Sequence, residues 1–372
     1  MRILSLIILT TILTSCRLAN REQKSTSEPP SQPIASDTLV LLFAGDIMQH
    51  QAQIDAAKRD STYNYDSYFT HIQEEIQSAD LAIANLETTI AGPPYTGYPQ
   101  FSAPTQLLTA IQKAGFDLLL TANNHILDRY SKGLTQTLNS LDSLKIAHIG
   151  SYRDATDRKQ RDPYIITLKD IKLAFLNYTY GTNGIPVKSP QLVNYIDTTL
   201  IKQDIALAKN KKSEAIIVCI HWGEEYETKP NKSQKQLAEW LIANGVDHII
   251  GSHPHVIQPI DIIKDPKERK NHIVVYSKGN FISNMSKKGT DGGLLFKLKL
   301  FKVEDKIEAK GSYSLVWVGR PKFTGEKNFS LFPINRERDK LNTNSHNRLI
   351  FFQKEANTVM KQNHPDIKEY FL

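Results

Sequence analysis

Short apolar runs alternate with amphipathic segments along most of the chain. Such runs are typical of buried strands, and segments with apolar residues three or four positions apart are typical of helices. Strands that alternate with helices indicate an α/β fold. We predict strands at residues 38–44, 81–84, 117–121, 146–149, 215–220, 246–250 and 272–276, and helices at residues 69–78, 105–114, 132–144, 201–208 and 233–243.

Two further stretches indicate antiparallel hairpins. One covers residues 163–177, about Lys169, and the other covers residues 293–318, about Asp305. In both, apolar runs flank a short polar turn, and the second shows the apolar–polar alternation of a strand pair. The sheets are therefore predicted to be mixed, with both parallel and antiparallel neighbours.

These elements predict one globular domain over residues 37–320. The remaining residues, 321–372, carry an apolar extended piece at 329–334 and a helical pattern at 348–360. We predict that this C-terminal extension packs on the domain.

The N-terminus has the features of a targeting segment. Arg2 precedes a short apolar stretch, and residues 13–16 (Leu-Thr-Ser-Cys) resemble a bacterial lipobox. We predict a lipoprotein signal peptide over residues 1–16 with lipidation of Cys16, although a plain secretory peptide or an uncleaved anchor has a similar pattern. Residues 17–36 are rich in Ser, Pro, Glu, Gln and Lys and predict a flexible linker. The expected location is the cell envelope, outside the cytoplasm and anchored to a membrane by lipid.

Composition narrows the possible partners. The chain has 372 residues, a formal net charge of +7, 40% hydrophobic and 23% charged residues. Its Lys and Arg residues are dispersed, whereas nucleic-acid binding needs a denser basic stripe. We predict no nucleic-acid partner, but attraction to an anionic polymer or a membrane surface is compatible with this charge. Apart from Cys16, only Cys219 is present, so the domain has no internal disulfide.

Polar residues with metal-binding side chains follow the predicted strands. Because strands of an α/β sheet present their carboxyl ends to ligands, carboxylate, amide and imidazole groups at these ends predict a divalent-cation site. His253 and His255 flank Pro254, and an extended backbone there would point both imidazoles to one side. The residues concerned are Asp46, His50, Asn85, Glu87, Asn124, His125, His221, His253, His255 and Asn280.

Six of these segments, in order, resemble the motifs of the CapA family, the bacterial capsule-synthesis proteins linked to poly-γ-glutamate. The resemblance covers about residues 38–285 and is carried by Gly45-Asp46-Ile47-Met48, Asn85-Leu86-Glu87, Ala122-Asn123-Asn124-His125 with Asp128, His221-Trp222-Gly223 with Glu225-Tyr226, Gly251-Ser252-His253-Pro254-His255 and Tyr276-Ser277-Lys278-Gly279-Asn280-Phe281. The family is related to calcineurin-like metallophosphoesterases. This implies a metallo-dependent phosphatase-like fold, a four-layer α/β/β/α sandwich with mixed sheets.

The resemblance also implies roles for individual residues. The implied metal ligands are Asp46, Glu87, Asn124, His221, His253 and His255, with His125 as the group that stabilises the leaving group. The related enzymes have a histidine at the position of Met48. We consider His50 as the residue that could replace this histidine as a metal ligand. Ile126 stands where an acidic residue is usual, and Asp128 is the nearby acid. These departures leave open whether one or two ions (Mn, Zn, Fe or Mg) bind.

Five residues have both a functional and a structural interpretation. Asp128 either acts on substrate or caps the turn before Gly133. Glu225 and Tyr226 follow His221 and either contact substrate or pack within their loop. Lys278 either meets a substrate anion or is solvated, and Asn280 either contacts substrate or forms a tight turn with Gly279. Asn85 is grouped with these candidates for substrate binding.

Two functions from different classes fit the sequence. The first is a metal-dependent hydrolase that acts on a phosphoester or on a bond in an anionic surface polymer, such as poly-γ-glutamate. The second is a non-enzymatic accessory that binds an anionic capsule polymer for assembly or export. In either case the capsule-synthesis machinery is a possible partner.

Overall fold

The computed structural model describes residues 38–265, 270–304, 306–336 and 341–372. The chain divides into two units, Met1–Ser36 and Asp37–Leu372, and the described residues all belong to the second. The predicted signal peptide (1–16), Cys16 and the linker (17–36) lie outside the described residues. Among the described helices, none is both long and apolar enough to cross a membrane.

The larger sheet contains nine strands of the described chain. Its order is β18-β17-β16-β1-β4-β5-β6, with β15 beside β1 and β19 beside β17. The pairs β1–β4, β4–β5 and β5–β6 are parallel, and β1–β16, β16–β17 and β17–β18 are antiparallel. The strands are β1 (Leu39–Ile47), β4 (Leu81–Leu86), β5 (Leu118–Leu120), β6 (Ala147–Ile149), β15 (Asn280–Ile282), β16 (Gly292–Val303), β17 (Lys306–Gly319), β18 (Ser330–Pro333) and β19 (Lys368–Glu369).

The second sheet contains six strands of the described chain in the order β13-β14-β12-β11-β9-β8. Its four central strands are parallel and both outer pairs are antiparallel, so this sheet is also mixed. The strands are β8 (Tyr164–Leu168), β9 (Ile171–Thr179), β11 (Ala215–His221), β12 (His248–Ser252), β13 (Ile260–Asp265) and β14 (Lys270–Val275).

Side-chain alternation along the strands builds the layers. Leu41 of β1 and Phe175 of β9 belong to one core cluster between the two sheets. Their neighbours point the other way, so Leu42 packs beneath the helices of the larger sheet and Leu176 beneath those of the second sheet. The central strands β1, β4, β9 and β11 are therefore buried on both faces, which explains why the sequence shows continuous apolar runs.

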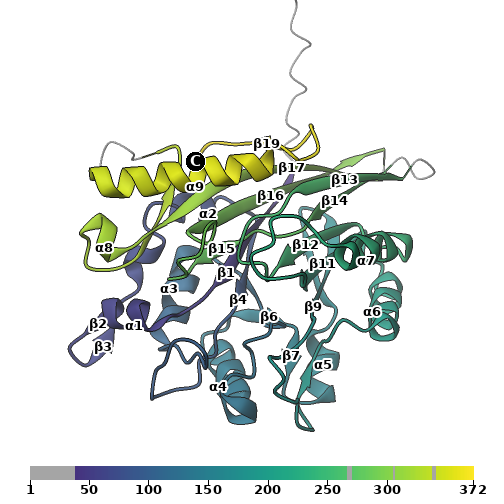
Figure 1. The fold of residues 1–372 in the computed structure, drawn as a ribbon. Helices are drawn as coiled ribbons and strands as arrows, with labels where there is room; N and C mark the ends of the chain where they lie inside the picture. Colours follow the sequence, from purple (N-terminus) through teal and green to yellow (C-terminus); the bar gives the residue numbers. More distant parts are fainter. Residues whose placement is uncertain (1–37, 266–269, 305, 337–340) are drawn as a thin grey trace, which may run out of the picture. The chain divides into compact units, whose positions relative to one another are not determined.

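Helices cover the two outer faces. On the larger sheet these are α2 (Gln73–Gln77) and α3 (Gln106–Ala114), and on the second sheet they are α6 (Thr198–Asn210) and α7 (Lys232–Ala243) (Figure 1). The result is an α/β/β/α sandwich with mixed sheets, which confirms the predicted fold class. The other described elements are α1 (Gln51–Ala57), β2 (Lys58–Arg59), β3 (Thr62–Tyr63), η1 (Asp66–Tyr68), α4 (Tyr130–Ser143), β7 (Ser151–Tyr152), α5 (Ala155–Arg161), β10 (Leu192–Val193), α8 (Pro321–Thr324) and α9 (Thr343–Met360).

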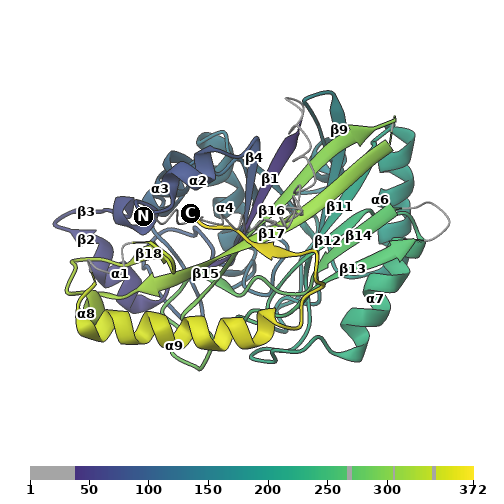
Figure 2. The ribbon, with the colours of Figure 1, turned by 90° about the horizontal axis from the view of Figure 1, so that it is seen from above.

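The C-terminal segment contributes to the core between the sheets. Strand β18 pairs with β17, and α9 lies beside β17, where it places Leu349 and Phe352 in the inter-sheet cluster (Figure 2). Fully burying one such side chain stabilises the fold by about 1.5–3 kcal/mol. The described residues of this segment therefore cover a part of the inter-sheet core.

One predicted helix is wrong in its extent. Residues 69–78 were expected to be helical throughout, but η1 precedes this stretch and only Gln73–Gln77 form α2. The adjacent Tyr68 and Phe69 are both buried in the same cluster, and the short turns between η1 and α2 let both rings point inward.

Candidate metal centre

The carboxyl ends of the central strands of both sheets meet at one edge of the sandwich. In the larger sheet Asp46 of β1 lies opposite Asn85 of β4, and in the second sheet His221 of β11 lies opposite Ser252 of β12. Glu87 follows β4, and His253 and His255 follow β12. The strand ends thus bring together carboxylates and imidazoles that lie as far as 209 positions apart, between Asp46 and His255.

Three overlapping groups of side chains have the spacing of metal ligands. In each group, one ligand atom per residue lies within 4.8 Å of those of the other two residues. Glu87, His221 and His253 form the first, Asp46, Glu87 and His255 the second, and Glu225, His253 and His255 the third. The first two groups share only Glu87, which therefore stands between them.

The environment of Glu87 fits a cation. This carboxylate is fully buried, and neither of its oxygens accepts a hydrogen bond from any described residue. Its Oε1 atom lies 3.5 Å from His221 Nε2 and 3.9 Å from His255 Nε2. The Nδ1 atom of His253 is also buried without a hydrogen-bond partner in the described chain. Because buried polar atoms are nearly always satisfied, these atoms indicate a group that binds here and supplies the missing contacts.

Amide side chains hold the ligand candidates in place. Asn85 Nδ2 donates to Asp46 Oδ1 at 2.7 Å, and Asn123 Nδ2 lies 3.2 Å from Asn85 Oδ1. Asn124 Oδ1 lies 2.8 Å from His221 Nε2, and Asn280 Oδ1 lies 3.1 Å from His255 Nδ1. Partners of this kind fix the orientation of ligating rings.

The histidine loop has a different backbone from the one predicted. An extended segment was expected, but His253 has φ 101° and His255 has φ 58°, in the left-handed region that non-glycine residues rarely adopt. The two rings still reach the same site, with their centroids 5.9 Å apart. Unusual backbone of this kind is costly and persists where surrounding contacts enforce it, which is common at functional sites. The backbone N–H of His253, which points toward Asp46 Oδ2 at 3.4 Å, is one such contact.

Burial and charge shift the pKa values of these groups in opposite directions. Burial lowers the pKa of His221 to about 3. Burial also acts to lower the pKa of His255, but Glu87 and Asp46 beside it raise this pKa to about 9. Burial raises the pKa of Glu87 well above its usual value, and the charge of Asp46 adds to this. For Asp46, the contacts with His255 and the charges of His221 and Lys278 outweigh burial and hold the pKa below its usual range.

His125 lies beside the ligand groups with its own acidic partner. Its Nδ1 atom lies 2.7 Å from Asp128 Oδ2, and this carboxylate also accepts a hydrogen bond from the backbone N–H of Phe101. The Phe101 ring packs against the imidazole with centroids 4.6 Å apart. Asp128 therefore both orients His125 and anchors the segment that contains Phe101, and its action on substrate stays a prediction.

Some predicted site residues lie elsewhere or have other contacts. His50 belongs to none of the three ligand groups, and its Nδ1 atom accepts a hydrogen bond from the backbone N–H of Asn284. Burial lowers its pKa to about 4. Met48 is a buried core residue, and the role of His50 as a substitute ligand stays a prediction.

The predicted substrate contacts separate into two classes. Lys278 is buried and donates to Gly251 O and Ser252 Oγ, each at 2.8 Å, so it anchors the start of the histidine loop rather than meeting a substrate. Asn85 and Asn280 are likewise buried and position ligand candidates. Glu225 and Tyr226 remain accessible next to His255: Glu225 Oε1 lies 4.0 Å from its Nε2, and the Tyr226 and His255 ring centroids are 6.2 Å apart.

Two residues of the site were missed in the sequence. Tyr180 and Asn183 follow β9, whose carboxyl end adjoins β11. The Tyr180 ring lies 4.5 Å from that of His253 between centroids and is 47% exposed, so it forms a wall of the site that faces solvent. Asn183 Oδ1 accepts from Asn124 Nδ2 at 3.2 Å. Like the other site residues, Tyr180 and Asn183 are polar residues that follow an apolar strand, and this pattern could have identified them.

The chain is similar to curated proteins of capsule synthesis. It is 28% identical to the capsule biosynthesis protein CapA of Bacillus anthracis over 272 residues, 70% of this chain and 63% of that protein. It is 27% identical to the PGA biosynthesis protein CapA of Bacillus subtilis over 262 residues, 68% of this chain and 66% of that protein. The match thus spans less than two thirds of the length of either relative.

Two solved structures are similar to this chain over most of its length. The NAD nucleotidase (NadN) of Haemophilus influenzae has a TM-score of 0.49 and 12% identity, over 90% of this chain and 64% of that one. The calcineurin-like phosphoesterase YfkN of Bacillus subtilis has a TM-score of 0.45 and 14% identity, over 87% of this chain and 98% of that one.

The family model described as bacterial capsule synthesis protein PGA_cap matches residues 40–285. This range includes every ligand candidate described above, from Asp46 to His255, and it confirms the resemblance that the ordered motifs indicate. Because the match covers more than half of the chain, this protein belongs to the PGA_cap family of bacterial capsule synthesis proteins.

Proposed function

We propose that this protein is a metal-dependent hydrolase of the cell envelope that cleaves a bond in an anionic surface polymer. The observation that carries this proposal is Glu87, a buried carboxylate with no hydrogen-bond donor in the described chain and with two histidines within 3.9 Å. A buried ionisable group without a partner is expensive unless it meets a cation or retains a proton. The family's role in capsule synthesis suggests the polymer as substrate.

The ligand candidates fit one or two divalent cations. Glu87, His221 and His253, with Asn124 next to His221, form one set, and Asp46, Glu87 and His255 form the other. Nitrogen and oxygen donors in this mixture suit Mn, Zn or Fe better than Mg, which prefers oxygen ligands alone. When bound, such a cation lowers the pKa of water and polarises the bond to be broken.

The chain's own residues supply the remaining chemistry. Asp128 accepts a hydrogen bond from His125 Nδ1, so the imidazolium form of His125, with a proton on each nitrogen, gives its Nε2 proton to the leaving group and returns to the neutral ring. Tyr180 lies beside His253, and Tyr226 and Glu225 lie beside His255. We assign these three residues to the orientation of the substrate. The proposal includes a lipid anchor at Cys16, which places the hydrolase on a membrane surface next to the capsule machinery.

Metal content and hydrolysis test the proposal together. The full chain is purified in mild detergent, its bound metals are measured, and hydrolysis of a phosphodiester and of poly-γ-glutamate is followed with Mn²⁺ or Zn²⁺. We expect bound metal and metal-dependent hydrolysis in the wild type, and loss of both in Glu87→Gln. Glu227→Gln, an exposed carboxylate outside the ligand groups, is the matched control. Polymer binding without metal or hydrolysis would favour the non-enzymatic accessory and overturn the proposal.

A further inference from the structure

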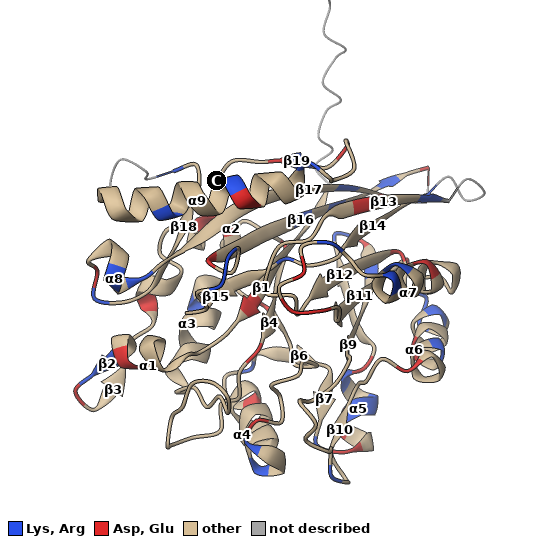
Figure 3. Ribbon diagram, in the orientation of Figure 1, with Lys and Arg blue, Asp and Glu red and all other residues tan. Residues whose placement is uncertain are grey.

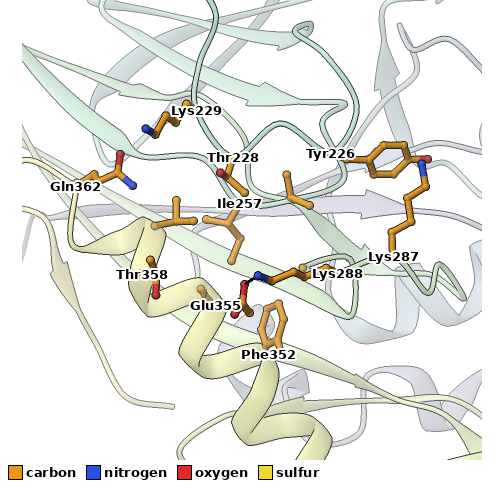
Figure 4. Close-up of a pocket in the computed structure, with 14 residues that line it drawn as sticks. Tyr226, Thr228, Lys229, Ile257, Lys287, Lys288, Phe352, Glu355, Thr358 and Gln362 are labelled. Atoms are coloured by element: carbon orange, nitrogen blue, oxygen red, sulfur yellow. Dashed lines mark ion pairs between the residues drawn. The ribbon is translucent and has the colours of Figure 1, made fainter.

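A cavity of about 710 Å³ lies next to the metal centre, between two loops and α9. The loop at residues 226–229 forms one side, the loop at residues 287–289 forms another, and α9 closes the third (Figure 4). Its apolar lining comes from Val256, Ile257, Phe352, Ala356 and Val359. Its volume is in the range typical of binding sites for small molecules and chain segments.

The cavity is continuous with the ligand loop. Val256 and Ile257 directly follow His255, and Tyr226, which lines the cavity, has its ring centroid 6.2 Å from that of His255. The backbone N–H of Tyr226 donates to Pro254 O at 2.8 Å, which ties the side of the cavity to the histidine loop. A polymer that is bound at the metal centre would therefore extend into this cavity.

The charge of the lining is positive. Lys229, Lys287, Lys288 and Glu355 are its charged residues. Lys288 pairs with Glu355 at 2.8 Å, whereas Lys229 and Lys287 have no carboxylate of the described residues within 4.0 Å. The Lys287 ammonium instead lies over the Tyr226 ring, 3.5 Å from its centroid (Figure 4). By contrast, Figure 3 shows Lys and Arg interspersed with Asp and Glu over most of the fold. The cavity therefore combines an apolar lining with two lysines that are not in ion pairs with the described residues.

We propose that this cavity binds a segment of a polyamide chain that carries one carboxylate per unit, next to the unit cleaved at the metal centre. Lys229 and Lys287 receive the carboxylates, the apolar floor receives the methylene groups, and Thr228, Thr358 and Gln362 provide hydrogen-bonding groups for the amides. This deepens the proposed function and rests on it for the bond that is cleaved. A small phosphoester would use the metal centre alone and leave the cavity unfilled.

A charge-removing pair of substitutions tests the cavity. One double variant of the full chain, the cavity pair, carries Lys229→Gln and Lys287→Gln. A second double variant, the control pair, carries Lys132→Gln and Lys159→Gln, which remove two exposed lysines on α4 and α5. Affinity for poly-γ-glutamate is measured directly at low salt in the Glu87→Gln background, where no hydrolysis interferes. We expect the cavity pair to weaken binding by at least about threefold, as for the loss of two exposed ion pairs, and the control pair to leave it unchanged. Salt should reduce this difference.

Kinetics with active protein provide a second readout. The cavity pair should raise KM for poly-γ-glutamate with little change in kcat, and should leave hydrolysis of a small phosphodiester unaltered. Thr358→Trp should also raise KM, because this exposed residue lines the cavity and a larger ring would fill it. Lys354→Trp, exposed on the same helix but outside the cavity, is its control.

The results separate the two proposals. Equal affinity and equal KM in the cavity pair and the control pair would refute the proposal that the cavity binds the polymer. This holds even if the wild type hydrolyses the polymer. Equally tight, lysine-dependent binding of polyphosphate, which has no methylene or amide groups, would overturn the assignment to a polyamide. In a third outcome, the wild type hydrolyses neither substrate, while the Lys229→Gln, Lys287→Gln variant binds the polymer more weakly than the wild type does. That result would refute the proposed function and support the cavity as a binding site.

Discussion

His125 Nδ1 and Asp128 Oδ2 lie 2.7 Å apart, and both side chains are almost completely buried. The same carboxylate oxygen accepts the backbone N–H of Phe101 at 2.9 Å. Asp128 thus holds the imidazole by one nitrogen and leaves the other free for chemistry. An aspartate in this place orients the ring and selects its tautomer.

We expect Asp128→Asn to lower kcat by roughly tenfold to a hundredfold, as loss of a supporting partner of an active-site residue typically does. The loss should be larger for a substrate with an alkoxide leaving group than for one that releases p-nitrophenol, because the weaker leaving group needs the proton from His125 more. Asp157→Asn on α5, which removes a comparable ion-paired carboxylate, should not change this ratio. An identical loss for both leaving groups would show that Asp128 is only structural.

Glu87→Gln should abolish metal binding without destabilising the metal-free protein. The wild-type carboxylate has no hydrogen-bond donor in the described chain, so a neutral amide of the same shape removes a buried group that is costly without metal. Thermal unfolding with and without Mn²⁺ measures both effects. Metal at 100 times its Kd should stabilise the wild type by about 2.7 kcal/mol and leave the variant unchanged. A lower Tm of the metal-free variant would show that Glu87 has a structural role instead.

The fold was predictable because most strands are buried on both faces and therefore appear as apolar runs. The elements that escaped prediction lack this signal. Helix α5 (Ala155–Arg161) has no apolar stripe and is held by ion pairs, such as Arg158 with Asp204 at 2.6 Å and with Asp162 at 3.0 Å. The pair with Asp204 depends on the tertiary structure and leaves no periodicity in the sequence.

The site was predictable where a polar residue follows an apolar strand, as for Asp46, Glu87 and His221. Tyr180 and Asn183 were not predicted because residues 163–177 indicate a hairpin, and a hairpin pattern does not show that the carboxyl end of its second strand lies beside β11. The backbone of His253 was not predictable, since its φ of 101° results from packing against Asp46 and its neighbours. The positioning role of Lys278 also depends on burial, which a single lysine in a sequence does not indicate.

Metal affinity should rise as the pH increases from 6 to 9. In the metal-free site, Glu87 and Asp46 raise the pKa of His255 to about 9, and burial raises that of Glu87. His255 therefore carries a proton at neutral pH, and a cation must displace it. Calorimetric titration with Mn²⁺ in buffers of different ionisation enthalpy measures the protons released. An affinity that is constant over this pH range, with no proton release, would contradict the assignment of His255 as a ligand.

Phe352→Ala should destabilise the protein far more than Phe351→Ala, although the two residues are adjacent on α9. Phe352 is buried in the core between the sheets, whereas Phe351 is 47% exposed. Removal of a buried phenylalanine side chain costs about 3–5 kcal/mol, because apolar contacts are lost and a cavity remains. Truncation of an exposed ring should change the free energy of unfolding by less than about 1 kcal/mol. Urea unfolding followed by tryptophan fluorescence compares the variants directly, since the buried Trp317 lies in the same cluster as Phe352. Equal stabilities of the two variants would show that α9 does not contribute to the inter-sheet core in solution.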